Sequence, residues 1–273
     1  MSVYLGSLGR LVELKCPASQ SVSIDDGYSF QTTLEGRVKA QARTVRPRSW
    51  SVDIGAATPA DLADLLAFAG GEWGNGPFVW VSTDAPVTNL LTPEVSLCGP
   101  QAVFSSTVSR TGPMALGDGR FSGASLMTSD PNGTLWVAAS KAPVPVLPGQ
   151  PVTASAYVLG AGGKVRLHWV AADGSAMNGT VTSAGTGTAG TPQRLHATGV
   201  PPVGAVSCTM STTKALQITR PAITWTDKLF DWQPGEGCQK AVLHGLSRNL
   251  ILALRDPSYG RYSSASFTIT EVG

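Results

Sequence analysis

Charged side chains are scarce in this sequence. Asp, Glu, Lys and Arg together make up 14% of the 273 residues, and the formal net charge is only +2. So small an excess does not suggest a dedicated nucleic-acid or anionic-membrane surface. No apolar run approaches the ~20 residues of a membrane helix, and the first residues lack the pattern of a signal peptide. We therefore expect no membrane insertion, no secretion, no nucleic-acid sequence recognition, and protein or sugar partners.

Cysteine and histidine are few and widely spaced. The cysteines are Cys16, Cys98, Cys208 and Cys238, and the histidines are His168, His196 and His244. No C-x-x-C or H-E-x-x-H spacing is present, which argues against a zinc site, and we predict no metal and no cofactor. Reduced, buried thiols are the simplest interpretation of the cysteines. A disulfide between Cys98 and Cys208 is the alternative.

Motifs for catalysis are missing as well. Residues 211–214 (Ser-Thr-Thr-Lys) have the spacing of acyl-serine enzymes, but the accompanying lysine-threonine-glycine element is absent. The glycine-rich segment 160–164 lacks the spacing of a phosphate-binding loop. Asp118, Asp130 and Asp173 adjoin Gly or Pro, as turn residues do. We therefore predict no catalytic residue and no enzyme. A glycoside-active enzyme is the least favoured alternative, because carboxylates from distant positions can still pair.

Turn residues, by contrast, are abundant. The 31 glycines and 19 prolines divide the chain into short segments that are typical of a mainly β fold. The clearest strand is 152–159, in which small apolar residues alternate with Thr, Ser and Tyr. Further strands are predicted at 164–171, 193–198, 205–212 and 215–219.

The segments before and after this strand-rich middle part of the chain have a different pattern. Short strands up to residue 54 precede one helix, Thr58–Ala69, with Thr58 as N-cap and an apolar face of Leu62, Leu65, Leu66 and Ala69. After Trp232 only about 35 residues remain, too few for an independent core. We predict that they complete the sheet of the first segment. The domains are then 1–86 and 235–273, forming one discontinuous β domain with one packed helix, and an inserted β-sandwich at 87–234.

Four short motifs follow one another in the middle segment. They are Asn-Leu-Leu-Thr-Pro-Glu at 89–94, Leu-Pro-Gly-Gln at 147–150, Pro-Gln-Arg-Leu at 192–195 and Trp-Gln-Pro-Gly at 232–235. Their order resembles that of a carbohydrate-binding-module-like jelly roll, whose tryptophan-x-arginine strand lacks its tryptophan here. The resemblance covers about half of the chain. A stand-alone carbohydrate-binding protein is therefore one alternative for the whole chain.

The organisation of the whole chain carries a second resemblance. The chain begins with strands, the segment 46–52 and a helix that starts Thr-Pro-Ala-Asp-Leu. A Trp-Gly loop, Phe-Val-Trp at 78–80, an inserted β domain and a return to strands follow. This order is similar to that of a minor tail protein of a long-tailed bacteriophage, of distal-tail type. The resemblance implies a tail-tube-like β domain and a structural protein of the virion tail tip, assembled in the host cytoplasm. It also implies a homo-oligomeric ring, six-fold in that family, with the tail tube and other tail-tip proteins as partners.

Aromatic residues are the remaining candidates for a site. Sugars present apolar C–H faces, so sugar-binding proteins use Trp and Tyr platforms beside polar side chains. We predict that Trp136, Tyr157 and Trp169 contact a host cell-wall glycan. Trp136 and Tyr157 are expected to share an open sheet face, whereas alternation with His168 also allows Trp169 to be a core residue.

Overall fold

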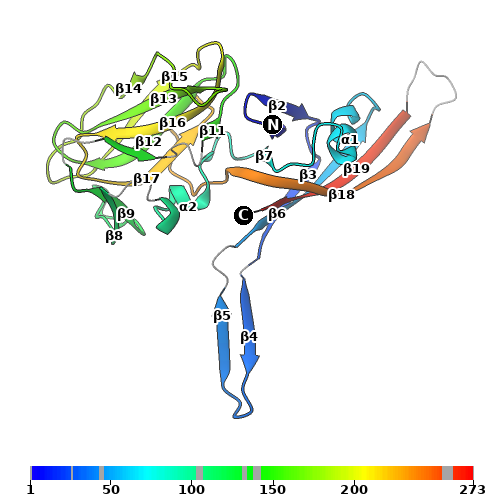
Figure 1. Ribbon diagram of the computed structural model, residues 1–273, viewed down its shortest axis with the longest axis horizontal. Coiled ribbons are helices and arrows are strands. Elements are labelled where there is room, and N and C mark those ends of the chain that lie inside the picture. Colours follow the sequence, from blue (N-terminus) through cyan, green and yellow to red (C-terminus); the bar gives the residue numbers. More distant parts are fainter. Residues whose placement is uncertain are drawn as a thin grey trace. The chain divides into compact units, whose positions relative to one another are not determined.

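The computed structural model describes residues 2–25, 27–42, 46–102, 107–130, 134–137, 143–253 and 261–272. Strands hold 51% of the residues and helices 6%, which confirms the mainly β fold class. The chain forms two compact units (Figure 1). Unit 1 comprises Met1–Leu5, Val12–Trp80 and Lys240–Gly273, and unit 2 comprises Gly6–Leu11 and Val81–Gln239.

Unit 1 contains a seven-stranded sheet in the order β2-β1-β7-β18-β19-β6-β3. The strands are β1 (Val3–Ser7), β2 (Arg10–Leu14), β3 (Ser19–Ile24), β6 (Arg48–Ala57), β7 (Phe78–Val81), β18 (Cys238–Ala253) and β19 (Arg261–Glu271). The two C-terminal strands lie between β7 and β6, so the last part of the chain completes the sheet that the first part begins. Trp50, Trp80 and Phe267 are buried in its core. The ring centroid of Trp80 lies 6.5 Å from that of Trp50 and 6.5 Å from that of Phe267.

Helix α1 (Ala63–Gly70) is shorter than the sequence predicts. Thr58 is not the N-cap of the regular helix, because residues 59–62 form turns and Leu62 occupies the cap position. The Thr58 and Asp61 side chains bond each other's backbone N–H groups, at 3.2 and 2.9 Å, as in a capping box, around these turns. The regular helix begins only after Leu62. It ends at Gly71, which adopts the left-handed conformation (φ 78°) that favours glycine.

The buried face of α1 also differs from the prediction. Leu62, Leu65 and Phe68 are at most 6% exposed, whereas Leu66 is 38% exposed and Ala69 is exposed. Phe68 determines this orientation, because its ring packs edge-on against two other aromatic rings, those of Trp73 and Phe78, at 4.9 and 5.1 Å. Leu62 and Leu65 are therefore buried as the sequence predicts, whereas the prediction is wrong for Leu66 and Ala69, and the buried face is rotated by about 50° towards Phe68.

A separate hairpin completes unit 1. Strands β4 (Tyr28–Thr32) and β5 (Val38–Ala42) form a two-stranded sheet and, within the described part of the chain, pair with no other strand (Figure 1). Their register places Phe30 opposite Ala40 and Thr32 opposite Val38.

Unit 2 is a β-sandwich. One sheet, called the β16 sheet below, has the order β10-β16-β13-β14, with β11 also pairing with β16. The other, called the β12 sheet, has the order β15-β12-β17-β9-β8. The strands are β8 (Val108–Thr111), β9 (Ser125–Thr128), β10 (Thr134–Val137), β11 (Val144–Pro145), β12 (Val152–Leu159), β13 (Lys164–Ala171), β14 (Val181–Thr182), β15 (Gln193–Gly199), β16 (Ala205–Thr213) and β17 (Gln217–Thr224). Strand β12 coincides with the predicted strand 152–159, and β13 with 164–171.

The core of the sandwich lies where strands β12 and β13 face each other. The apolar positions of the 152–159 alternation, Val152, Ala154, Ala156 and Val158, are all 0% exposed. They meet Val165 and Leu167 of β13, which are also fully buried. Alternating apolar residues thus form one face of each sheet, as the period-2 pattern predicts.

The segment 89–94, the first of the four motifs that resemble a jelly roll, does not form a strand. Thr92 instead caps a short helix, α2 (Pro93–Ser96), by accepting a hydrogen bond from the Val95 N–H group, and a 3-10 turn follows at Pro100–Ala102. Asn89 is fully buried and bonds the backbone of distant residues. Proline at the first helical position explains the helix, since its fixed φ suits a helix start and it has no N–H to donate.

Candidate functional site

The outer face of the β16 sheet carries a group of polar and aromatic side chains. On β13, Val165, Leu167 and Trp169 point into the core, so Lys164, Arg166 and His168 point outward. On β10, Leu135 and Val137 are buried, and Trp136 points outward with 43% of its surface exposed. Strand β16 lies between β10 and β13 and pairs Ser211 with both Trp136 and Arg166.

His168 is held by three contacts on this face. Its Nε2 atom is 2.7 Å from the Ser211 hydroxyl, and its Nδ1 atom is 3.3 Å from the Thr180 hydroxyl. Its ring lies against Trp136, with centroids 4.6 Å apart and planes inclined by 41°. Burial, and then the positive charge of Arg166, lower the pKa of His168 below its ordinary value of 6.5. The neutral imidazole is therefore favoured near pH 7 in the free protein.

Arg166 is a half-buried cation without a carboxylate partner in the described structure. Its Nε atom is buried and makes no hydrogen bond to any described residue. No Asp or Glu occurs in any of the strands β8–β17, so none of them brings a negative charge to this face. Among the described strands of this face, the basic side chains therefore have no acidic neighbour.

The outer face of the β12 sheet is a second candidate. Tyr157 pairs across strands with Arg194, whose Nη2 atom donates a 3.4 Å hydrogen bond to the Ser155 hydroxyl. Burial lowers the pKa of Arg194, and nearby Tyr157 and Asp231 raise it. Unlike Arg166, this arginine thus has an acid nearby, and its positive charge is partly compensated.

The three predicted glycan contacts do not come together. Trp169 is 1% exposed, and its indole N–H donates to the Gly179 carbonyl at 3.1 Å, so it is a core residue and its prediction as a contact is wrong. Trp136 belongs to the β16 sheet and Tyr157 to the β12 sheet, and each points away from the core. The expectation of one shared face is therefore also wrong, because the two outer faces of a sandwich lie on opposite sides.

The sequence analysis did not identify two residues of the outer face of the β16 sheet. Arg166 and Lys164 occupy positions of the same parity as His168 in a strand that was predicted correctly, so that parity alone would have placed all three on one face. Ser211 was considered only as part of the Ser-Thr-Thr-Lys motif at 211–214. It lies in β16, within the predicted strand 205–212, and is fully buried beneath the outward side chains.

The Ser211–His168 contact is not a complete catalytic triad. A serine nucleophile of that type needs a carboxylate on the other imidazole nitrogen and an accessible hydroxyl. Here Nδ1 faces a threonine hydroxyl, and Ser211 is 0% exposed. The arrangement fixes the orientation of the imidazole beside Trp136 on the outer face.

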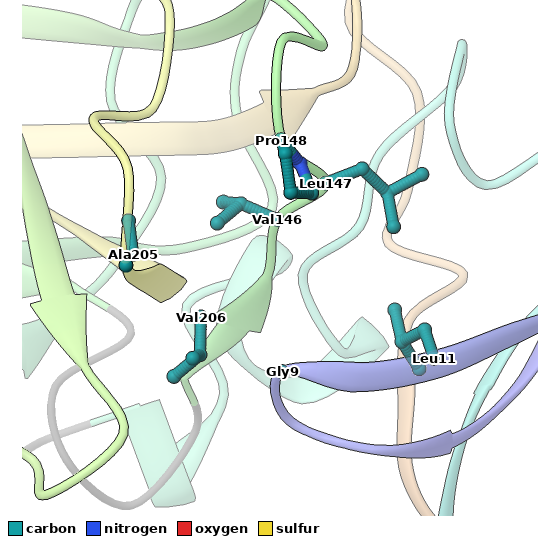
Figure 2. Close-up of a pocket in the computed structure, with 8 residues that line it drawn as sticks. Gly9, Leu11, Val146, Leu147, Pro148, Ala205 and Val206 are labelled. Atoms are coloured by element: carbon teal, nitrogen blue, oxygen red, sulfur yellow. The ribbon is translucent and has the colours of Figure 1, made fainter.

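A cavity of about 230 Å³ in unit 2 is less suited to chemistry. Figure 2 shows Leu11 and Leu147 on one side of the cavity and Val146 and Val206 on the other, and the remaining lining residues are glycine, alanine and proline. No titratable side chain lines it. Since polar groups orient most ligands in their pockets, this cavity offers little specificity.

The described residues contain no group of three or more His, Cys, Asp or Glu side chains that could hold a metal ion. Cys98 and Cys208 are buried free thiols, so the alternative of a disulfide between them is wrong. Burial raises the pKa of Cys98 to about 11, which keeps it protonated and unreactive at neutral pH. Among the described helices, none combines the length and apolar character needed to cross a membrane.

Comparison with known proteins gives little further guidance. No protein-family model and no curated protein matches the chain. Among solved structures, one similar chain is that of the Clostridium thermocellum N-terminal endo-1,4-beta-D-xylanase 10B, CBM22-1–GH10 modules, complexed with xylohexaose. The two chains share 14% sequence identity and a TM-score of 0.34, over 48% of this chain and 27% of that chain. The functional proposals below rest on the geometry of the two units.

Proposed function

We propose that this protein is a structural subunit of a phage tail tip, which assembles into a ring through unit 1 and contacts host-surface saccharides through unit 2. The observation that carries the proposal is the β4–β5 hairpin. Tyr28, Phe30 and Val38 are 45%, 67% and 66% exposed, and the register places them on one face. Ser29, Gln31, Lys39 and Gln41 alternate with them on the other. An isolated two-stranded hairpin is marginally stable in water, so this apolar face requires a partner.

A second copy of the chain is the partner that unit 1 favours. The seven-stranded sheet ends at β3, where Val22 and Ile24 are 56% and 63% exposed. An edge strand offers unpaired backbone groups to another chain, and here apolar side chains as well. The hairpin and the edge are different surfaces of one chain, so contact between them is heterologous and closes into a ring when the rotation per subunit permits. The distal-tail resemblance implies six copies.

Mass measurement by light scattering tests the assembly. We expect the wild-type chain to have a multiple of its 28.2 kDa mass. A Phe30→Lys, Val38→Lys double variant should be monomeric, because it places charge on the apolar face of the hairpin. A Gln31→Lys, Gln41→Lys variant adds the same charge to the polar face of the same hairpin and should assemble as the wild type does. A strictly monomeric wild type, alone and with its tail-tip partners, would contradict a ring.

Unit 2 supplies the second part of the proposal. One face has a half-exposed Trp136 and, on the far side of Ser211, Arg166. The other face has Tyr157 beside Arg194. These are the residue types that bind sugars. A ring of several copies raises the effective affinity of weak sites about 10²–10⁴-fold. A glycan array with the wild type, Trp136→Ala and Tyr157→Ala would show which face binds. Saccharide binding by a strictly monomeric chain would favour the stand-alone carbohydrate-binding protein instead.

A further inference from the structure

The outer face of the β16 sheet has a chemical character that narrows its ligand. We propose that this face binds an anionic saccharide, one whose sugar carries a carboxylate or phosphate group, with Trp136, Arg166 and His168 as its contact residues. The inference rests on the proposed saccharide-binding function of unit 2, because it names the saccharide class and the face that binds it.

The charge of the face is the first argument. Lys164, Arg166 and His168 follow one another on the outward side of β13, and no strand of unit 2 contributes an acid. Positive charges kept without carboxylate partners repel one another and cost free energy unless an anion compensates them. A carboxylate or phosphate would accept charge-assisted hydrogen bonds from the Arg166 guanidinium, whose planar fork matches both groups.

Trp136 is the second argument. Its indole is 43% exposed, although an aromatic ring of this size is normally more buried, and its position is fixed by the contact with the His168 ring. A fixed aromatic surface binds the C–H face of a sugar ring with little loss of side-chain entropy. A cationic arginine beside a held tryptophan therefore suits a ligand with an apolar ring face and an anionic substituent.

The hydroxyl layer beneath the face is the third argument. Ser211 and Thr180 occupy both ring nitrogens of His168, at 2.7 and 3.3 Å, and so fix the imidazole. A hydroxyl group can accept as well as donate a hydrogen bond, so both contacts remain when the imidazole gains a proton. His168 can thus add a positive charge when an anion binds, without moving.

A nucleic acid is the competing anionic ligand, and the face favours it less. Continuous nucleic-acid surfaces combine many phosphate contacts with several stacking aromatics. Here one exposed tryptophan accompanies three basic residues of a single strand, and the net charge of the whole chain is +2. One or two sugar units match this extent better than a strand of several nucleotides.

Isothermal titration of the full-length chain with matched probes tests the proposal. We would use trigalacturonate, its methyl ester, which keeps the rings but loses the charges, a ribitol-phosphate oligomer and oligo-dT. We expect trigalacturonate or the ribitol phosphate to bind at least about tenfold more tightly than the methyl ester, with an affinity that falls as salt is added. Preference for one of the two anionic probes identifies the carboxylate or the phosphate as the recognised group.

Variants locate the binding. Arg166→Gln and Trp136→Ala should each weaken binding of the anionic probe about tenfold or more, whereas Lys228→Gln, which removes the same charge from an exposed loop, should change it less than about twofold. Thermal unfolding of each variant verifies its fold. If Arg166→Gln does not fold, Trp136→Ala and the comparison of acid with methyl ester decide.

Several outcomes would overturn the inference. They are equal binding of acid and ester, no loss in the Arg166 and Trp136 variants, and oligo-dT binding as tight as that of the anionic saccharides. Binding of a neutral glycan that is lost in Tyr157→Ala would also overturn it, while leaving the proposed saccharide function intact at the other face. Absence of binding to every saccharide would remove both, and light scattering would still decide the ring separately.

Discussion

At the scale of single residues, the side-chain amide of Asn89 joins distant backbone segments of unit 2 by hydrogen bonds. Its Nδ2 atom donates to the carbonyls of Pro221 and Gln233, and its Oδ1 atom accepts from the N–H groups of Leu91 and Ile223, each at 3.1 Å. The side chain is 0% exposed, so its removal leaves buried backbone groups unpaired. We expect Asn89→Ala to lower the free energy of unfolding by about 2–4 kcal/mol.

Urea unfolding of the wild type and the variant measures this loss. Asn178→Ala is the matched control, because Asn178 is exposed, and it should change the free energy of unfolding by less than about 0.5 kcal/mol. Equal effects of the two substitutions would show that the Asn89 hydrogen bonds add nothing specific to unit 2.

His168 is expected to make the free energy of unfolding depend on pH. Burial and then Arg166 lower the pKa of its imidazole in the folded chain, so the unfolded chain binds more protons as the pH falls through the ordinary value of 6.5. The His168 contribution to stability is therefore fully present above pH 6.5 and is lost as the pH falls toward the lowered folded pKa. Below that pKa it no longer changes.

Denaturant midpoints between pH 7.5 and pH 5 check the sign. Other titrating groups are common to the wild type and His168→Gln, so they cancel in the difference between the two. We expect the free energy of unfolding to fall less in the variant than in the wild type over this range. A larger fall in the variant would mean that His168 is stabilised, rather than destabilised, in its charged form.

At the scale of elements, the orientation of α1 can be tested with two adjacent leucines. Leu65 is 1% exposed and Leu66 is 38% exposed. Leu65→Ala should cost about 2–5 kcal/mol, because it leaves a cavity in the core, and Leu66→Ala less than about 1 kcal/mol. Thermal or urea unfolding of the two variants makes the comparison. A larger cost at Leu66 would restore the helix face that the sequence predicts.

Strands were easier to predict than the helix, for a physical reason. In β12 and β13 the period-2 alternation is local, so residues 152–159 and 164–171 can be assigned from the chain itself. The rotation of α1 depends instead on Phe68, which packs against Trp73 and Phe78 through tertiary contacts. A helical face that contains two adjacent leucines does not show which of them is buried.

At the scale of the whole molecule, the candidate site shows the same limit. Alternation correctly turns Trp136 and Tyr157 outward, and it left Trp169 open as a core residue. It cannot tell which sheet a strand joins, because β10 pairs with β16, about 75 residues away along the chain, and β12 pairs with β15 and β17. The separation of the two aromatics onto opposite faces therefore follows from strand order.

The two ends of the inserted unit are hydrogen-bonded to each other. Glu236 N–H donates to the Asn89 carbonyl at 2.8 Å, and Gly237 N–H donates to the Leu91 carbonyl at 2.9 Å, so the segments that enter and leave unit 2 pair with each other. The sequence placed the boundaries at 86/87 and 234/235, whereas the main segment of unit 2 is Val81–Gln239, to which Gly6–Leu11 is added. A fragment 87–234 would lose both hydrogen bonds and also the contact of the Gly235 N–H group with Ser96 Oγ at 2.7 Å.

We therefore expect fragment 81–239 to unfold cooperatively, at a higher urea midpoint than fragment 87–234, since each lost buried hydrogen bond costs about 1 kcal/mol. Equal midpoints would show that the paired ends add no stability and that the shorter boundaries are sufficient.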